Sequence, residues 1–307
     1  MIDALLVVMA LIWGANYAIV KGAFGEIAPH AFNAARMSIA SLAFLATISA
    51  LQLRPVRRQD SIASTFQTPV KMTGRDWIEL AGLGIVGHFL YQFFFIGGLA
   101  LTTVANSSLL LAATPVVIGL LSAPLGHERV SARHWAGAAL SMLGIYIVVG
   151  RGVAVSAQGL KGDLLVAAAV LCWAAYTLGA RRLISRHSPV GVTGLSMAMG
   201  TVVYLGVVWP HVAATTWSQL SARTWLAILY SAIFALAVAY TIWYAAVRQI
   251  GSARTAVYSN LIPLVAMATA VIFLGEPLRA RNVVGAAAVL LGVALTRTAP
   301  AARSPQP

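Results

Sequence analysis

Residues 260–295 read NLIPLVAMATAVIFLGEPLRARNVVGAAAVLLGVAL, two long apolar blocks joined by a short polar turn. Four landmarks of this stretch repeat earlier ones 148 residues away: Pro263, Glu276, Gly285 and Gly292 follow Pro115, Glu128, Gly137 and Gly144. Two more landmarks, Trp173 and Pro189, follow Trp13 and Pro29 at a distance of 160 residues. The chain is therefore a duplication, and the number of helices in each copy decides how the two copies are oriented in a membrane.

The composition is that of a membrane protein. Of the 307 residues, 60% are apolar and 9% are charged, whereas soluble domains contain about 25% charged residues. The apolar residues form ten blocks of about 20 residues, the length that a helix needs to cross a bilayer: 4–22, 31–52, 77–99, 102–123, 135–150, 164–184, 190–210, 224–247, 252–274 and 281–297. The blocks predict an all-α integral membrane protein with ten transmembrane helices. Because each copy holds five, the second copy must be inverted.

The distribution of Lys and Arg predicts the orientation. With the N-terminus in the cytoplasm, the inner loops and tail hold fourteen of these residues and the outer loops six, which favours both termini inside. We expect a first five-helix repeat at 1–152, a second, inverted one at 153–298, and a flexible cytoplasmic tail at 299–307. The net charge of +13 is interpreted as this topological signal together with attraction to anionic lipid, and no nucleic-acid partner is expected.

Aromatic and amide side chains recur on faces of four spans. In the first copy they share one helical face by their spacing of three and four residues, and the second copy presents equivalent positions. These are the expected substrate-binding residues: Trp13, Asn16, Tyr17, His88, Tyr91, Gln92, Trp173, Tyr176, Tyr240, Trp243 and Tyr244. The alternatives are an aromatic belt at the membrane interface, or hydrogen bonds that only join helices.

Two ionisable residues lie inside spans of the first copy and lack a counterpart in the second. His88 is interpreted either as a neutral imidazole bonded to Tyr or Gln neighbours, or as a substrate contact or proton-linked switch. Arg36 either caps carbonyls and snorkels to the outer surface, or binds a substrate carboxylate. No Asp or Glu occupies the middle of a span, so we expect weak or no proton coupling.

The repeated prolines and glutamates have structural interpretations. Pro115 and Pro263 fall in mid-span, where proline favours a kink, so paired bending of two helices is a predicted gate; packing without motion is the alternative. Glu128 and Glu276 occur at helix ends and are expected to pair with a nearby arginine such as Arg133 or Arg281. The repeated glycines suit close helix contact, or a dimer face.

Three stretches carry a resemblance to a known family: LIWGANYAIVKG at 11–22, PHAFNAAR at 29–36, and the stretch at 260–295. They resemble the EamA-type ten-helix exporters of the drug/metabolite transporter superfamily, most specifically in Gly275-Glu276-Pro277. His127 departs from the usual glycine before Glu128, and Ser196 stands where the second copy would match Arg36. The resemblance implies export across the cell inner membrane. Amino acids, including aromatic ones, are a frequent substrate class of the family, with drugs, purines and other metabolites as competing choices.

Chemistry-bearing motifs are not found in the sequence: it has no HExxH, no phosphate-binding loop and no paired acids in the spans. We therefore expect no enzyme, no cofactor and no metal. The expected partners are a small-molecule substrate and membrane lipid, with the chain as a monomer or homodimer. The predicted mechanism is alternating access through a midplane cavity, and a non-transporting assembly or sensor subunit is the alternative of another class.

Overall fold

The structure, a computed structural model, describes most of the chain. The described residues are 2–52, 63–66, 70–114, 116–117, 121, 133, 136–137, 139–140, 143–144, 146–147, 157–250, 255, 258–259 and 261–297. Within them the chain forms helices and connecting turns, without a strand.

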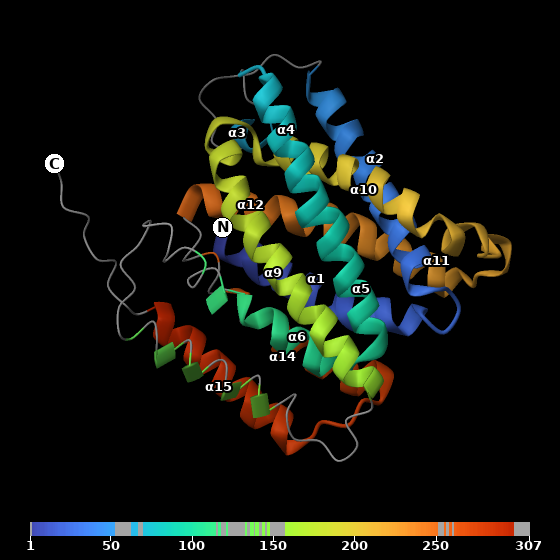
Figure 1. The fold of residues 1–307 in the computed structure, drawn as a ribbon, viewed down its shortest axis with the longest axis vertical. Helices are drawn as coiled ribbons and strands as arrows, with labels where there is room; N and C mark the ends of the chain where they lie inside the picture. Colours follow the sequence, from blue (N-terminus) through green and yellow to red (C-terminus); the bar gives the residue numbers. More distant parts are fainter. Residues whose placement is uncertain are drawn as a thin grey trace.

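The helices follow one another closely along the chain (Figure 1). Their bounds are α1 Ile2–Ala23, α2 Pro29–Gln52, α3 Ala63–Phe66, α4 Gly74–Leu83, η1 Gly84–Leu90, α5 Tyr91–Leu101, α6 Val104–Ala112, α9 Ala157–Arg186, α10 Pro189–Ala213, η2 Trp217–Gln219, α11 Ala222–Tyr230, η3 Ser231–Val238, α12 Ala239–Ile250, α14 Leu261–Leu274 and α15 Ala280–Arg297.

Six helical stretches in the described part of the chain are long and apolar enough to cross a membrane. They are Ile2–Ala23, Pro29–Leu51, Gly74–Leu101, Ala157–Arg186, Pro189–Ala213 and Ala222–Gln249. They confirm six of the ten predicted blocks as spans of membrane length. The helices Leu261–Leu274 and Ala280–Gly292 are apolar but shorter, and the blocks 102–123 and 135–150 each lie partly outside the described residues.

Side chains next to the spans determine where the helices begin. Thr73 and Asp76 form a capping box, in which each side chain accepts a hydrogen bond from the other residue's backbone N–H. Ser188 caps α10 and is followed by Pro189, whose missing N–H leaves no bond unmade in the first turn. Ser221 caps α11 in the same way as Ser188 caps α10. These polar residues fix the points at which α4, α10 and α11 begin.

Two spans contain a π-helical segment at related positions. η1 lies between α4 and α5, and η3 lies between α11 and α12. The backbone N–H of Tyr91 donates to the carbonyl of Val86, and that of Ala239 donates to the carbonyl of Phe234. Both bonds span five residues, and the second repeats the first 148 residues later. The apolar periodicity did not predict these wider turns, which in other proteins are frequent at functional sites.

Several packing contacts between the two halves of the chain have an equivalent in which the roles of the halves are exchanged. η1 packs against α10 and η3 against α2, while α1 packs against α14 and α9 against α6. Likewise α5 packs against α9 and α12 against α1, and α2 crosses α10 (Figure 1). Replacing each helix by its equivalent in the other half of the chain converts each of these contacts into another contact of the same set. The contact between α2 and α10 is its own equivalent.

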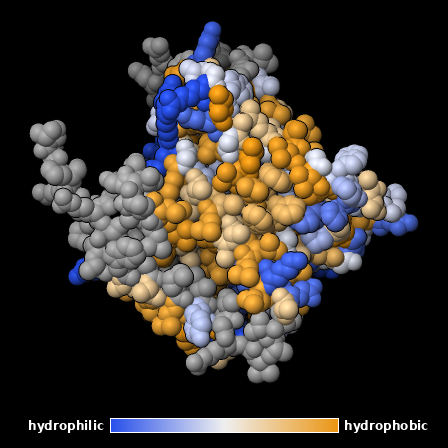
Figure 2. Space-filling view, viewed as in Figure 1, coloured by the Kyte–Doolittle hydropathy of each residue, from blue (hydrophilic) through white to orange (hydrophobic). Residues whose placement is uncertain are grey.

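Apolar side chains cover much of the outside of the bundle. Figure 2 shows hydrophobic residues over the middle of the visible face, with hydrophilic residues gathered towards its upper end and one side. Large exposed side chains include Ile78, Val202 and Ile272, each more than 70% exposed. A lipid-facing surface accounts for this exposure, because a water-facing surface rarely carries so large an apolar patch.

One predicted boundary differs from the structure. The block expected at 252–274 is interrupted by a turn at Ser259, and α14 begins only at Leu261. Pro263 is therefore the third residue of α14. In this first turn its missing N–H would have no intrahelical partner, so the proline starts the helix without breaking a hydrogen bond.

Glycines allow η1 and α10 to approach closely. A Cβ atom on Gly200 would lie 2.4 Å from the carbonyl oxygen of Gly84 and 2.7 Å from the Cβ of His88. A Cβ atom on Gly84 would in turn lie 2.6 Å from the carbonyl oxygen of Ser196. Backbone cannot move aside as a flexible side chain can, so only glycine fits at this crossing.

We therefore expect Gly200→Ala to destabilise the fold by about 1–3 kcal/mol, the usual cost of overpacking. The matched control is Gly206→Ala in the same helix, where a Cβ atom would meet nothing within 4 Å. The thermal unfolding midpoint of the detergent-solubilised protein measures both changes. Equal midpoints for the two variants would contradict the assignment of the α10 crossing as a close backbone contact.

Candidate functional site

Aromatic rings from both halves of the chain meet inside the bundle. The centroid of the Trp13 ring of α1 lies 5.7 Å from that of Tyr240 and 5.6 Å from that of Trp243, both of α12. The indole N–H of Trp13 donates a 2.8 Å hydrogen bond to the carbonyl of Ala235 in η3. The contact with Tyr240 is edge-to-face, which the quadrupoles of the two rings favour.

The ring of Trp173 from α9 continues the same cluster. Its centroid lies 5.5 Å from that of Tyr240, 5.1 Å from that of Tyr91 and 5.7 Å from that of Tyr176. His88 lies beside Tyr176 with a ring distance of 5.0 Å, and its Nε2 is 3.3 Å from the Tyr176 hydroxyl. This hydrogen bond fits the interpretation of His88 as a neutral imidazole with a tyrosine neighbour.

The remaining predicted residues lie around these rings. Tyr17 contacts Phe95, which stacks on Tyr91, and Tyr244 contacts Tyr176 and Tyr240. Asn16 and Gln92 are buried at 6% and 2% exposure. The structure thus brings the predicted aromatic residues and His88 into one set of ring contacts, hereafter the aromatic cluster: Trp13, Tyr17, His88, Tyr91, Phe95, Trp173, Tyr176, Tyr240, Trp243 and Tyr244. All of them are buried or half-buried, which argues against a belt at the membrane interface.

Polar atoms on four of the predicted site residues are buried without a hydrogen-bond partner. They are Oδ1 of Asn16, Nδ1 of His88, Nε1 of Trp243 and the hydroxyl of Tyr244. An unsatisfied buried polar group costs about 1–3 kcal/mol. These atoms are free acceptors and donors that a polar solute could satisfy.

Arg36 enters this region from α2. Its side chain is 1% exposed and donates three hydrogen bonds: to Oδ1 of Asn33 at 2.6 Å, to Oγ of Ser231 at 2.7 Å and to Oε1 of Gln92 at 2.6 Å. The guanidinium therefore does not snorkel to the surface. Asn33 and Ser231 were not among the predicted site residues; Asn33 precedes Arg36 by one helical turn, which could have indicated it.

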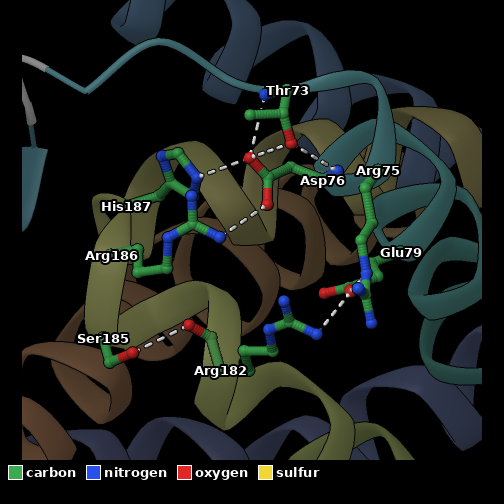
Figure 3. Close-up of polar contacts among 8 residues, drawn as sticks. All are labelled: Thr73, Arg75, Asp76, Glu79, Arg182, Ser185, Arg186 and His187. Carbon is green, nitrogen blue, oxygen red and sulfur yellow. Dashed lines mark hydrogen bonds and ion pairs between the residues drawn. The ribbon is translucent and has the colours of Figure 1, made fainter.

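Polar side chains join α4 to α9 at the end expected to face the cytoplasm (Figure 3). The carboxylate of Asp76, 1% exposed, pairs with Arg186 at 3.2 Å and lies 3.3 Å from Nε2 of His187. Glu79, one turn later, pairs with Arg182 at 3.1 Å and with Arg75 at 3.1 Å. This inner cluster consists of Thr73, Arg75, Asp76, Glu79, Arg182, Arg186 and His187.

A second polar cluster joins helix ends at the opposite side. Lys21, at the end of α1, pairs with Glu276 at 3.2 Å and donates to the carbonyl of Thr102. Both carboxylate oxygens of Glu276 also accept from the backbone N–H of Val104, the first residue of α6. The expected arginine partner of Glu276 is wrong, because the observed ion pair is with Lys21. Glu128 lies outside the described residues.

The turn at Gly275 explains how Glu276 reaches these partners. Gly275 has φ +64°, a left-handed conformation that glycine adopts without steric cost. It ends α14, and the N–H of Glu276 donates back to the carbonyl of Ala270. Asp163, in the second turn of α9, accepts from Thr102 at 2.5 Å and from Asn106 at 3.2 Å. The outer cluster is hereafter Lys21, Thr102, Asn106, Asp163 and Glu276.

A cavity of about 520 Å3 lies elsewhere, between α1, α11 and α14. Its lining on α1 includes Ala15, Ala18, Ile19 and Gly22, which lie on the helical face opposite Trp13. It is therefore separate from the aromatic cluster. Glu26 at its edge accepts from Ser221 and Thr224, and these hydrogen bonds lower the pKa of its carboxyl.

The remaining predictions concern prolines, glycines and metals. Pro115 lies outside the described residues, and the gating role of Pro263 stays a prediction. A Cβ atom on Gly144 would lie 2.8 Å from the carbonyl oxygen of Gly285, which confirms close helix contact at this pair. Among the described residues, no three His, Cys, Asp or Glu side chains are grouped to hold a metal ion.

Comparison with known proteins identifies the fold. The model of the EamA-like transporter family matches residues 1–150 and 160–298. A probable terminal-alkyne amino-acid exporter of Streptantibioticus cattleyicolor is 25% identical over 94% of this chain and 91% of its own length. The aromatic amino acid exporter YddG of Ancylobacter novellus is 28% identical over 52% of this chain and 55% of its own. A solved structure at 20% identity has a TM-score of 0.63 and covers 95% of this chain and 94% of that one.

The ion pairs of Glu276 and Glu79 differ in how far their basic partners are exposed, and this difference gives a test. We expect Glu276→Gln to destabilise the protein by about 1–2 kcal/mol, because it weakens the pair with Lys21 and the cap of α6. The control, Glu79→Gln, breaks pairs with Arg75 and Arg182, which are 72% and 50% exposed, and should cost at most about 1 kcal/mol. Thermal unfolding in detergent measures both. A larger loss for Glu79→Gln would be the contrary result.

Proposed function

The chain belongs to the EamA-like transporter family and is a multi-pass membrane transporter, and on that premise we propose that it exports small amphipathic solutes, most of all amino acids including aromatic ones. The transport would cross the cell inner membrane by alternating access. The observation that carries the proposal is the aromatic cluster, in which Trp13 and Trp173 from the two halves both contact Tyr240. The names of the two exporters described above support the same substrate class.

The chemistry of the aromatic cluster suits an amphipathic solute. Its rings offer apolar faces, whose negative quadrupole also attracts an ammonium group. The unpartnered Oδ1 of Asn16 and Nε1 of Trp243 supply an acceptor and a donor beside those faces. A solute with an apolar body and a few polar groups would replace ring-to-ring contacts with its own.

We propose that the ten-helix architecture is two inverted five-helix repeats, 1–152 and 153–298, with both termini and the tail 299–307 cytoplasmic. The exchanged packing pairs support it, because η1 on α10 and η3 on α2 are related by swapping the halves. The paired π-helical hydrogen bonds at Tyr91 and Ala239 support it as well. Two such halves can exchange conformations, which makes the inward-open and outward-open states close in energy.

The polar clusters at the two ends would serve as the gates. The inner cluster holds α4 against α9, and the outer cluster holds α1 and α14 against α5, α6 and α9. Opening one side requires breaking one cluster while the other remains closed. The π-helical segments η1 and η3 adjoin the aromatic cluster and provide points at which spans could bend.

Coupling to protons is proposed to be weak or absent. Six of the eight Asp and Glu residues are described, and all six lie near helix ends or in turns: Asp3, Glu26, Asp76, Glu79, Asp163 and Glu276. None of these six is in the aromatic cluster. A proton-driven pump commonly carries a carboxylate along its pathway, so transport would follow the gradient of the solute.

Substitution of the shared tryptophan tests the site. We expect Trp173→Ala to reduce counterflow of aromatic amino acids in proteoliposomes by about tenfold or more, since aromatic contacts contribute about 0.5–1.5 kcal/mol each beyond the area that they bury. The control is Trp209→Ala, which removes a 61% exposed indole on α10. Unchanged transport by Trp173→Ala would falsify the placement of the site, and no saturable counterflow in the wild type would contradict the substrate class.

Cross-linking tests the inner gate. In a Cys172→Ser background, which removes the one cysteine of the chain, Glu79→Cys and Arg182→Cys place thiols on α4 and α9. A bifunctional maleimide should stop transport by holding the two helices together. The control pair, Arg75→Cys with Glu79→Cys, lies within α4 and should keep most of its activity after the same treatment. Full transport by the cross-linked α4–α9 pair would exclude this end as a gate.

A further inference from the structure

The guanidinium of Arg36 is a buried charge whose hydrogen-bond partners are all neutral. Asn33, Gln92 and Ser231 accept its three hydrogen bonds. The ion pairs of the described residues join other groups, near the helix ends. An ionised side chain inside a membrane span is costly and in most proteins is paired or functional. The dipoles of three neutral side chains hold this charge in place without neutralising it.

The charge retains capacity for a further ligand. A guanidinium has five N–H donors in a planar fork, and the three hydrogen bonds of Arg36 use three of them. The fork matches a carboxylate, which can accept two parallel hydrogen bonds. Three different elements position the group, because Asn33 and Arg36 come from α2, Gln92 from α5 and Ser231 from η3.

Arg36 lies at the edge of the aromatic cluster. Gln92, which accepts from Arg36, follows Tyr91 of the cluster, and Ser231, which also accepts from Arg36, lies in η3, whose Ala235 accepts from Trp13. Tyr240 in turn contacts Trp13 and Trp173. A solute among these rings would therefore be within the field of a fixed positive charge, and Asn16, about one turn after Trp13 in α1, carries an unpartnered Oδ1.

We propose that Arg36 binds the carboxylate of the transported solute, so that the substrates are monocarboxylates with an aromatic or apolar body. The inference rests on the proposed function and narrows it. The carboxylate accepts from the guanidinium and neutralises the buried charge, while the apolar body packs on Trp13, Trp173 and Tyr240. An ammonium group, where the solute has one, finds the acceptor of Asn16 and the faces of the rings.

The experiment measures how well four solutes compete with the counterflow of an aromatic amino acid in proteoliposomes. L-phenylalanine carries both charged groups, 3-phenylpropionate lacks the ammonium, and phenethylamine and phenylalaninamide lack the carboxylate. We expect both acids to compete with the wild-type protein about 10-fold to 100-fold better than the amine and the amide, the range of a hydrogen bond to a charged group.

Arg36→Gln should lose this preference, by weakening the acids and leaving the amine and the amide nearly unchanged. Arg36→Lys keeps the charge without the fork, so it should retain a part of the preference and also serves if Arg36→Gln fails to fold. The matched control is Arg181→Gln, an exposed arginine of α9, which should keep the preference of the wild type. The thermal unfolding midpoint of each variant reports its folding separately.

The outcomes separate this inference from the proposed function. Equal weakening of acids and amines in both Arg36 variants would show a structural role for Arg36 and overturn the inference. A wild-type protein that transports the panel without preferring acids would also overturn it, while export of amphipathic solutes would stand. Failure of all four solutes to compete with any saturable counterflow would count against the proposed function and the inference together.

Discussion

The close crossing of η1 and α10 is the constraint on which the inside of the bundle depends. Because Gly84 and Gly200 bring two backbones together, His88 is held against α10 and its imidazole reaches Tyr176. Gly87 adds to this, since a Cβ atom there would lie 2.1 Å from the Tyr176 ring. In a bilayer, apolar side chains gain little from leaving lipid for another helix, so small residues and interhelical hydrogen bonds have to bring helices together. The positions of His88 and Tyr176 in the aromatic cluster therefore depend on this close contact between helices.

The sequence predicted the members of the aromatic cluster other than Phe95, because their spacing has a direct physical meaning. Side chains three and four residues apart share a helical face, and amides avoid lipid, so Trp13, Asn16 and Tyr17 had to point inwards. The duplication then extended the same reasoning to Trp173 and Tyr176. The six spans of membrane length followed from hydropathy alone. Features that depend on the residue pattern of a single helix are therefore predictable from the sequence.

The features that the sequence missed depend on more than one helix. A π-helical segment replaces one pattern of backbone hydrogen bonds by another, as at Tyr91 and Ala239, and leaves no mark in apolar periodicity. The ion pair between Lys21 and Glu276 joins residues 255 positions apart, and nearer arginines appeared equally suitable in sequence. Asn33 and Ser231 become candidate site residues only because the fold places both against the guanidinium of Arg36. The spacing of residues along the chain therefore does not predict a contact whose partner is determined by the packing of different helices.

The asymmetry of the two halves bears directly on how one solute could be selected. Two related halves favour a site with similar walls, and Trp13 and Trp173 supply such walls around Tyr240. A symmetric aromatic site alone would accept a solute in either of two opposed orientations. If Arg36 binds the carboxylate as proposed, it removes that ambiguity, because the equivalent position in the second half holds Ser196, whose hydroxyl donates to the backbone of Thr193. In the proposed transport, a single fixed charge on one side of the site would give the solute one orientation, and the similar rings from the two halves would leave the two proposed gates balanced around it.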